Sequence, residues 1–217
     1  MKVVSRFIVV SFLTVGLSST ALADVAPKPT PKTGKLDVHF QLRSYFSAGG
    51  VSAGIGGNAE NKVNTPTPYK GKAKPGSRVR LLVSPPDATS RWGAFAGRTI
   101  QVVNTGRRAV IFDAQDSLLD IVHEAKNSAG VWTKIEYMPQ SWCGNSYHTL
   151  SLPGKSKWSF TAPVYTGDTP VKMRVRIVTQ SGVVRSEVFD GNINADQFDV
   201  AKKQGHQATN LMDPYID

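Results

Sequence analysis

The sequence predicts an all-β fold in which antiparallel strands form a sandwich. Short apolar or alternating segments recur at intervals of roughly 8 to 12 residues, and glycine, proline or asparagine residues separate them. No segment before Asn194 repeats its apolar residues with a helical period. The chain of 217 residues is also long enough to bury a core without disulfide bonds.

The N-terminus has the three parts of a cleavable export signal. Lys2 and Arg6 precede an apolar stretch, and Ala21-Leu22-Ala23 is the small-residue pattern that signal peptidase cleaves. The apolar stretch is shorter than the ~20 residues needed to cross a bilayer, and no later segment approaches that length. We therefore expect a secreted or periplasmic protein after cleavage near Ala23, with no transmembrane segment in the mature chain.

After the signal peptide, residues 1–23, three parts are expected along the chain. They are a spacer rich in proline and lysine over 24–35, a β-sandwich domain over 36–204 and a C-terminal tail over 205–217. Within the domain, the Gly-rich segment 47–77 is predicted to be a flexible loop that adds little stability. Its composition cannot bury enough apolar surface to offset the entropy of ordering it. A short helix is expected within residues 195–204.

Strands are expected wherever residues alternate or form an apolar run between turns. The first alternates from Leu36 to Leu42, and later ones end at turns such as Asn104-Thr105-Gly106 and Pro153-Gly154. In chain order they cover residues 36–42, 79–83, 99–103, 109–112, 118–123, 131–137, 147–152, 157–162, 171–179 and 183–189. The expected core residues are Val102, Ile111, Leu119, Ile121, Ile135, Leu150, Phe160, Val175 and Ile177.

The order of these strands and turns resembles that of a known class of module. A strand, an Asn-x-Gly turn and a second strand over 102–112 are followed by a Pro-Gly turn at 153–154 and an aromatic strand at 158–160. This succession resembles the immunoglobulin-like modules of exported bacterial proteins over residues 98–189. The resemblance implies an immunoglobulin-like antiparallel β-sandwich that binds or spaces other molecules. The chain departs from antibody-type domains because its single cysteine, Cys143, cannot form an intramolecular disulfide.

The positive charge is concentrated in the N-terminal half of the mature sequence. Residues 24–109 hold 14 Lys/Arg against 4 Asp/Glu, whereas residues 110–217 hold 10 against 12. A basic surface outside the cytoplasm predicts an anionic partner of the envelope or extracellular space: a polymer, a glycan or a protein. The candidate binding residues are Lys62, Lys70, Lys72, Lys74, Trp142 and Tyr147. Nucleic acid is not expected, because Tyr69 is the one aromatic residue available for stacking in this basic stretch.

A glycan could instead stack on aromatic side chains. Trp132, Trp142 and Trp158 could form such a platform together with Tyr137, Tyr147 and Tyr165. The other interpretation is that these aromatic residues pack in the core or at strand edges.

Cys143 and His148 are the residues considered for catalysis, because a thiol nucleophile needs a nearby imidazole to lower its pKa. A buried structural cysteine is the other interpretation. The same pair with His123 and Met138 contains the ligand types of a blue-copper site, but the order along the chain differs from that of cupredoxins. Gly50-Val51-Ser52-Ala53-Gly54 matches a hydrolase nucleophile motif but lacks the helix that should follow it.

The function expected from the sequence is therefore non-enzymatic binding or spacing. The alternative is a thiol-dependent enzyme or redox protein that uses Cys143 and His148.

Calcium is the second metal considered, and no other cofactor is expected. Oxygen-bearing side chains occupy every second position in the set Asp190, Asn192, Asn194 and Asp196, as in the first half of a calcium loop. Ala195 and Ala201 stand where that loop needs its glycine and its closing glutamate. An Asp-Gly turn after the last strand is the other interpretation.

Overall fold

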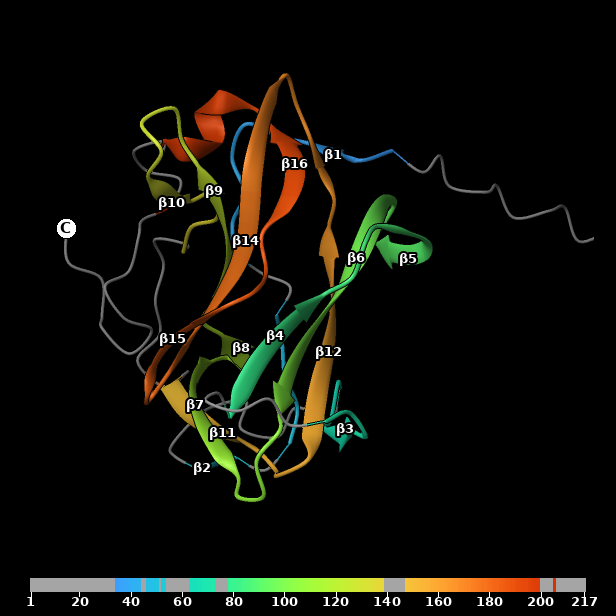
Figure 1. Cartoon of the computed structure of the whole chain (residues 1–217), viewed down its shortest axis with the longest axis vertical. Coiled ribbons are helices and arrows are strands. Elements are labelled where there is room, and N and C mark those ends of the chain that lie inside the picture. Colours follow the sequence, from blue (N-terminus) through green and yellow to red (C-terminus); the bar gives the residue numbers. More distant parts are fainter. Residues whose placement is uncertain are drawn as a thin grey trace, which may run out of the picture. The chain divides into compact units, whose positions relative to one another are not determined.

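The computed structural model describes residues 34–43, 46–50, 52–53, 63–72, 78–138, 147–199 and 205, which all belong to the unit Pro31–Asp217. Within these residues the fold is nearly all β, with several antiparallel sheets and one short 3₁₀ helix (Figure 1). No helix among them has the length and apolar character needed to cross a membrane.

Three larger sheets and one strand pair make up the described fold. The first sheet has the order β3 (Thr67–Pro68), β12 (Ser156–Pro163), β6 (Phe95–Asn104), β4 (Val79–Val83), and β5 (Asp87–Trp92) also pairs with β6. The second has the order β10 (Trp132–Lys134), β9 (Ile121–Lys126), β14 (Thr169–Thr179), β15 (Gly182–Arg185), and β16 (Phe189–Ile193) also pairs with β14. The third has the order β2 (Ser52–Ala53), β11 (Tyr147–Leu152), β7 (Val110–Gln115), β8 (Leu118–Leu119). The pair, β1 (Leu36–Asp37) with β13 (Tyr165–Thr166), is parallel.

Side chains from all three larger sheets meet in one apolar cluster. Trp158 and Phe112 pack edge to face with ring centroids 5.4 Å apart, and Phe46 and Phe160 do so at 5.5 Å. Most of the predicted core residues are buried, namely Val102, Leu119, Ile121, Ile135, Leu150, Phe160, Val175 and Ile177. The prediction for Ile111 is wrong, because Ile111 is half-buried and its neighbour Phe112 faces the core.

The predicted strands differ from the observed ones mainly at their ends. β4 and β11 have the predicted bounds, whereas residues 38–42 of the first expected strand are not in β1. The expected strand 118–123 is interrupted at Asp120 and becomes β8 and β9. The last expected strand ends at Arg185, and a further strand, β16, follows it.

In the described part of the expected C-terminal helix, residues 195–199, the structure has a 3₁₀ turn, η2 (Ala195–Phe198), and residues 200–204 lie outside the described residues. The side chain of Gln197 accepts a hydrogen bond from the backbone N–H of Asn194 at 3.3 Å. The backbone hydrogen bonds of a 3₁₀ helix have poorer geometry than those of an α-helix, so such helices rarely exceed one turn.

The segment 47–77 takes part in the fold where the structure describes it. Ala48 is fully buried, and the indole N–H of Trp158 donates a hydrogen bond to the carbonyl oxygen of Gly49 at 2.9 Å. β2 pairs with β11, and β3 pairs with β12. The described residues of this segment thus contact the core and the sheet edges, and the prediction of a flexible loop that contributes little stability stays a prediction. Residues 51, 54–62 and 73–77 lie outside the described part, as do the expected signal peptide and most of the spacer and tail.

Candidate functional site

The side chain of Asn104, the last residue of β6, joins two turns at one end of the first sheet. Its Nδ2 lies 2.8 Å from the carbonyl oxygen of Arg108, 3.0 Å from that of Leu152 and 3.1 Å from that of Pro153. Its Oδ1 accepts a hydrogen bond from the backbone N–H of Gly106 at 3.0 Å. Asn104 is fully buried, so these bonds compensate for the loss of its hydration. One amide thus holds the turn after β6 against the turn before β12.

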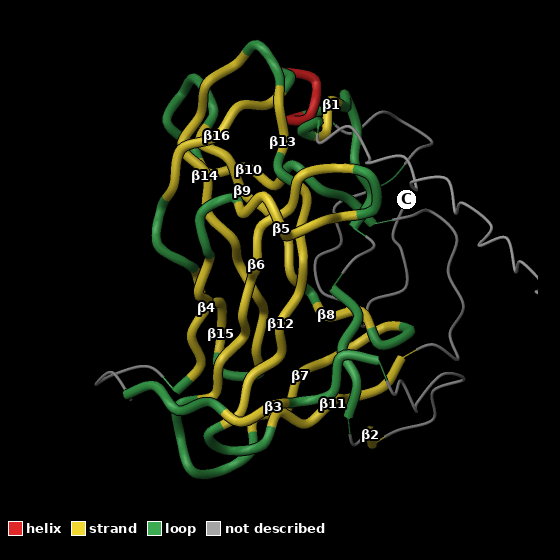
Figure 2. Tube along the Cα trace, turned by 90° about the vertical axis from the view of Figure 1, so that its right-hand side faces the viewer, coloured by secondary structure: helices red, strands yellow, loops and turns green. Residues whose placement is uncertain are grey.

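Backbone hydrogen bonds add the neighbouring segments to this end of the sheet. The N–H of Thr105 donates to the carbonyl oxygen of Arg78, just before β4, at 2.8 Å. The N–H of Lys155 donates to Gly106 at 2.9 Å, and the N–H of Tyr69 donates to Lys155 at 2.7 Å. Four separate segments of the chain therefore meet here, at the lower end of the molecule in Figures 1 and 2, where β3 is labelled.

Gly154 is required for this close approach. A Cβ atom at Gly154 would lie 2.1 Å from the carbonyl oxygen of Arg107, a separation that no side chain tolerates. Lys155 follows with a φ of 56°, in the left-handed region that costs a non-glycine residue roughly 1 kcal/mol or more. The Pro153-Gly154 turn thus places Lys155 beside Arg107.

Basic side chains gather on these segments. We call them the basic cluster, and they are Lys70, Lys72, Arg78, Arg80, Arg107, Arg108, Lys155 and Lys157. Arg80 and Lys157 are half-buried and lie on either side of Val103 in the strand register, and the other members are exposed. Val103 is fully buried between them, because the aliphatic parts of long basic side chains cover apolar surface.

No member of the basic cluster forms an ion pair with another described residue. The second sheet differs, because most of its cations face carboxylates. Its ion pairs are Arg174–Glu124 at 2.6 Å, Arg176–Asp120 at 3.7 Å, Arg185–Glu124 at 4.0 Å and Lys172–Asp190 at 2.6 Å. The uncompensated positive charge is therefore concentrated on the turns of the first sheet. A surface of this kind attracts anions over several ångströms.

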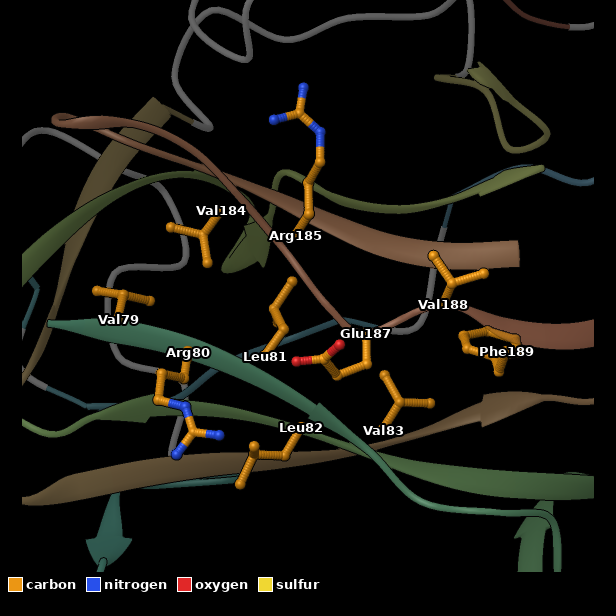
Figure 3. A pocket seen from close by; sticks show the side chains of 10 residues that line it. All are labelled: Val79, Arg80, Leu81, Leu82, Val83, Val184, Arg185, Glu187, Val188 and Phe189. Carbon is orange, nitrogen blue, oxygen red and sulfur yellow. The ribbon is translucent and has the colours of Figure 1, made fainter. Parts of the chain in front are cut away.

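A groove of about 350 Å³ between β4 and β15 adjoins the cluster at Arg80 (Figure 3). Leu81 and Val184 line it, and the carboxylate of Glu187 points toward Leu81. The guanidinium of Arg80 lies on the side of β4 away from Val184. Apolar side chains, two arginines and one glutamate line the groove, so its charge does not single out one kind of partner, and the basic cluster is the more selective surface.

Two of the predicted binding residues, Lys70 and Lys72, belong to the basic cluster. Lys62, Lys74 and Trp142 lie outside the described residues, and Tyr147 is half-buried in β11. Sequence reasoning missed the other members of the cluster. One feature of the sequence could have indicated them: turns between antiparallel strands can meet at the same end of a sheet. Four of these basic residues follow such predicted turns, namely Arg107, Arg108, Lys155 and Lys157.

Three of the aromatic residues considered for a glycan platform pack in the core instead, so the platform interpretation is wrong for them. Trp158 is fully buried, Tyr137 and Tyr165 are buried as well, and they pack inside the protein. Trp132 is half-buried on β10, where the guanidinium of Arg174 stacks 4.1 Å from its ring.

The residues considered for catalysis are only partly described. His148 is buried on β11, and its Nε2 lies 3.5 Å from Oγ of Ser117. Cys143 lies outside the described residues, so its pairing with His148 stays a prediction. Ser52 lies in β2 and pairs with Leu150, so it is not at the strand-to-helix turn that a hydrolase nucleophile needs.

The other residues considered for copper have separate contacts. Nδ1 of His123 lies 2.8 Å from Oε1 of Glu136, and Sδ of Met138 lies 3.6 Å from a guanidinium nitrogen of Arg43. Among the described residues, no group of three His, Cys, Asp or Glu side chains is arranged to hold a metal ion.

The residues considered for calcium also have protein partners. Asp190 pairs with Lys172 at 2.6 Å, and Asn192 lies 3.5 Å from the carbonyl oxygen of Gly167. The side chain of Asn194 donates to Asp37 at 2.7 Å, and Asp196 lies 3.2 Å from His39. The expected Asp-Gly turn is wrong, because Asp190 and Gly191 belong to β16, which extends the pairing along β14. A calcium ion at these residues stays a prediction.

Comparison of the chain with protein-family models, with curated proteins and with solved structures gives no match. The resemblance to immunoglobulin-like modules therefore stays a prediction.

Proposed function

We propose that this protein is an exported, non-enzymatic binding module that holds an anionic polymer of the cell envelope or extracellular space. The observation that supports the proposal best is the basic cluster, which gathers eight cations with no ion pair to another described residue. Natural surfaces usually intersperse charges of both signs, so a group of one sign favours a partner of the opposite sign.

The shape of the cluster favours a polymer over a small anion. Its members lie on four separate segments and most are exposed, so no single pocket encloses them. An isolated exposed charge contributes at most about 1 kcal/mol to a contact, because water and salt screen it. A polyanion contacts many such charges together and releases its counterions, so the small contributions combine.

The architecture that we propose for the module is an immunoglobulin-like β-sandwich. The shared core supports it, because apolar side chains of β4, β6 and β12 pack in one cluster with those of β9 and β14 from the second sheet. The export signal at residues 1–23 supports the proposed location outside the cytoplasm.

The proposal is tested with dextran sulfate as the anionic probe and uncharged dextran as its control. The test variant carries Lys70→Gln, Lys72→Gln and Arg108→Gln. The matched variant removes the same charge from the second sheet through Lys126→Gln, Lys172→Gln and Arg185→Gln. Affinity is measured over a series of salt concentrations.

We expect the wild type to bind dextran sulfate, to ignore dextran and to lose affinity steeply with salt. The test variant should bind at least about tenfold more weakly, and its log–log salt slope should decrease by roughly 0.7 to 0.9 for each lost contact, as for phosphates in nucleic acids. The matched variant should bind like the wild type. Equal weakening in both variants would mean that net charge alone causes the attachment, and would overturn the proposed site.

A further inference from the structure

A separate cavity of about 140 Å³ lies near the start of β6, away from the basic cluster. Lys35, Arg98, His123, Tyr165, Met173 and Asp190 are among the residues that line it. This volume is enough for a few water molecules or one small ligand, since a water molecule occupies about 30 Å³ in the liquid.

The alternation of side chains along β6 places Arg98 in this cavity. Alternate residues of a strand share a face, and Ile100 and Val102, the next residues on the face of Arg98, are fully buried in the core. The side chain of Arg98 therefore projects between the sheets, and only 5% of its surface is exposed.

The guanidinium of Arg98 has no counter-charge among the described residues. It lies 4.2 Å from the ring centroid of Phe189, and it forms no hydrogen bond or ion pair with any of them. Burial lowers the pKa of Arg98, but an arginine side chain stays protonated at neutral pH. Contact with an aromatic ring contributes about 0.5 to 2 kcal/mol and leaves the N–H donors without a protein acceptor among the described residues.

The other charged groups of the cavity do not neutralise Arg98. The carboxylate of Asp190 pairs with Lys172 at 2.6 Å, and Lys35 adds a second positive charge at the exposed rim. Nδ1 of His123 faces Glu136, which lies behind the histidine and also accepts a hydrogen bond from Tyr165 at 2.6 Å. A cation that lines a cavity and has no protein counter-charge among the described residues favours an anion as the ligand.

We propose that this cavity binds a small organic monocarboxylate, whose two oxygens accept hydrogen bonds from the guanidinium of Arg98. The planar fork of arginine matches a carboxylate in a bidentate pair. The thioether of Met173 and the ring of Tyr165 offer apolar walls for a short hydrocarbon chain. Inside the cavity Arg98 offers one guanidinium fork, while Lys35 stays at the exposed rim, which favours a carboxylate over a phosphate dianion.

The proposal is tested by calorimetric titration of the purified protein with sodium butyrate at constant ionic strength. The comparison variants are Arg98→Met, which keeps the size and removes the charge, and Arg185→Met, which removes an exposed charge on the second sheet outside the basic cluster and the cavity. Sodium phosphate is titrated in parallel. We expect saturable butyrate binding to the wild type and to Arg185→Met. Binding to Arg98→Met should be weaker by roughly 10- to 100-fold, the loss of a charge-assisted pair.

Absence of butyrate binding to the wild type, or equal binding to Arg98→Met, would overturn the proposal. Stronger binding of phosphate than of butyrate would overturn the ligand class.

The ligand-free melting temperature of Arg98→Met shows whether the variant folds, and it should equal or exceed that of the wild type because an unpaired buried charge is removed. If Arg98→Met fails to fold, Arg98→Lys keeps the charge without the planar fork and should bind butyrate several-fold more weakly than the wild type. Equal binding to Arg98→Lys would overturn the bidentate contact.

Discussion

Two hydrogen bonds join Glu136 to His123: one carboxylate oxygen accepts the backbone N–H of His123 at 2.8 Å, and the other lies 2.8 Å from its Nδ1. Both residues are buried, with 1% of their surface exposed. The hydroxyl of Tyr165 donates to the same carboxylate at 2.6 Å, so Glu136 contacts three polar groups of two residues, His123 on β9 and Tyr165 on β13. A buried carboxylate with this many donors orients the residues around it.

We predict that Glu136→Leu lowers the free energy of unfolding by roughly 3 to 5 kcal/mol, because it removes the acceptor of three buried hydrogen bonds. Tyr165→Phe removes a single donor and should cost about 1 kcal/mol. Urea denaturation measures both. The control is Lys172→Met in the exposed pair with Asp190, which should change stability by less than about 1 kcal/mol. An equal effect in Glu136→Leu and in this control would contradict the prediction.

Asn104→Ala should both destabilise the protein and weaken its attachment to dextran sulfate. The change removes two hydrogen bonds to the turn before β12 and two within the turn after β6, each contributing about 1 kcal/mol, so the expected loss is roughly 2 to 4 kcal/mol. The basic cluster should then spread, and its affinity for a polyanion should fall. Asn127→Ala, in the turn between β9 and β10, is the matched control because Asn127 also bonds its own turn. It should leave the affinity unchanged.

The pH dependence of stability should include a contribution from Lys134 in β10. Burial is the main reason that the pKa of Lys134 lies below its ordinary value of 10.5, and the charge of Arg176 lowers it further. Between the two values the unfolded chain binds more protons than the folded protein, so stability rises with pH in that window. Above 10.5 the lysine is neutral in both states and the rise ends. Unfolding measured across this range should show a smaller rise in Lys134→Met, whereas equal slopes would refute the contribution.

Phe112→Ala should cost roughly 3 to 5 kcal/mol, because it removes a fully buried ring and leaves a cavity. Ile111→Ala should cost less than about 2 kcal/mol, because Ile111 is only half-buried. Thermal or urea unfolding of the two variants decides which face of β7 points inward. A larger loss in Ile111→Ala would contradict the observed register.

Ile111 and Phe112 also show where prediction of strands from the sequence succeeds and where it fails. An apolar strand at residues 110–112 was predictable from composition, but Ile111 and Phe112 are adjacent and both apolar. A shift of one residue exchanges the two faces of a strand, so the local pattern could not decide between them. β5 was missed for a related reason. Its residues 87–90 contain no large apolar side chain and look like a loop, and the strand forms because β6 extends past β4 and offers a partner edge.

The candidate site was predictable only in part. Exposed lysines in the basic stretch were apparent from composition, and Lys70 and Lys72 belong to the basic cluster. The other members become neighbours through long-range pairing of β3, β12, β6 and β4, which no local pattern encodes. The roles of Asn104 and Gly154 likewise depend on which turns meet, so their residue types signal a turn and nothing more.

Among the described residues, unpaired cations lie on the turns of the first sheet and ion-paired charges on the second, and we expect this separation to produce an electric dipole. In the field of a charged polymer the molecule should rotate before contact, so that the turns beside Asn104 approach first. Arg98 is six residues back along β6, about 20 Å from Asn104 at the rise of a β-strand. Molecules attached through the basic cluster would therefore share one orientation, with the cavity at Arg98 left open to the surrounding solution.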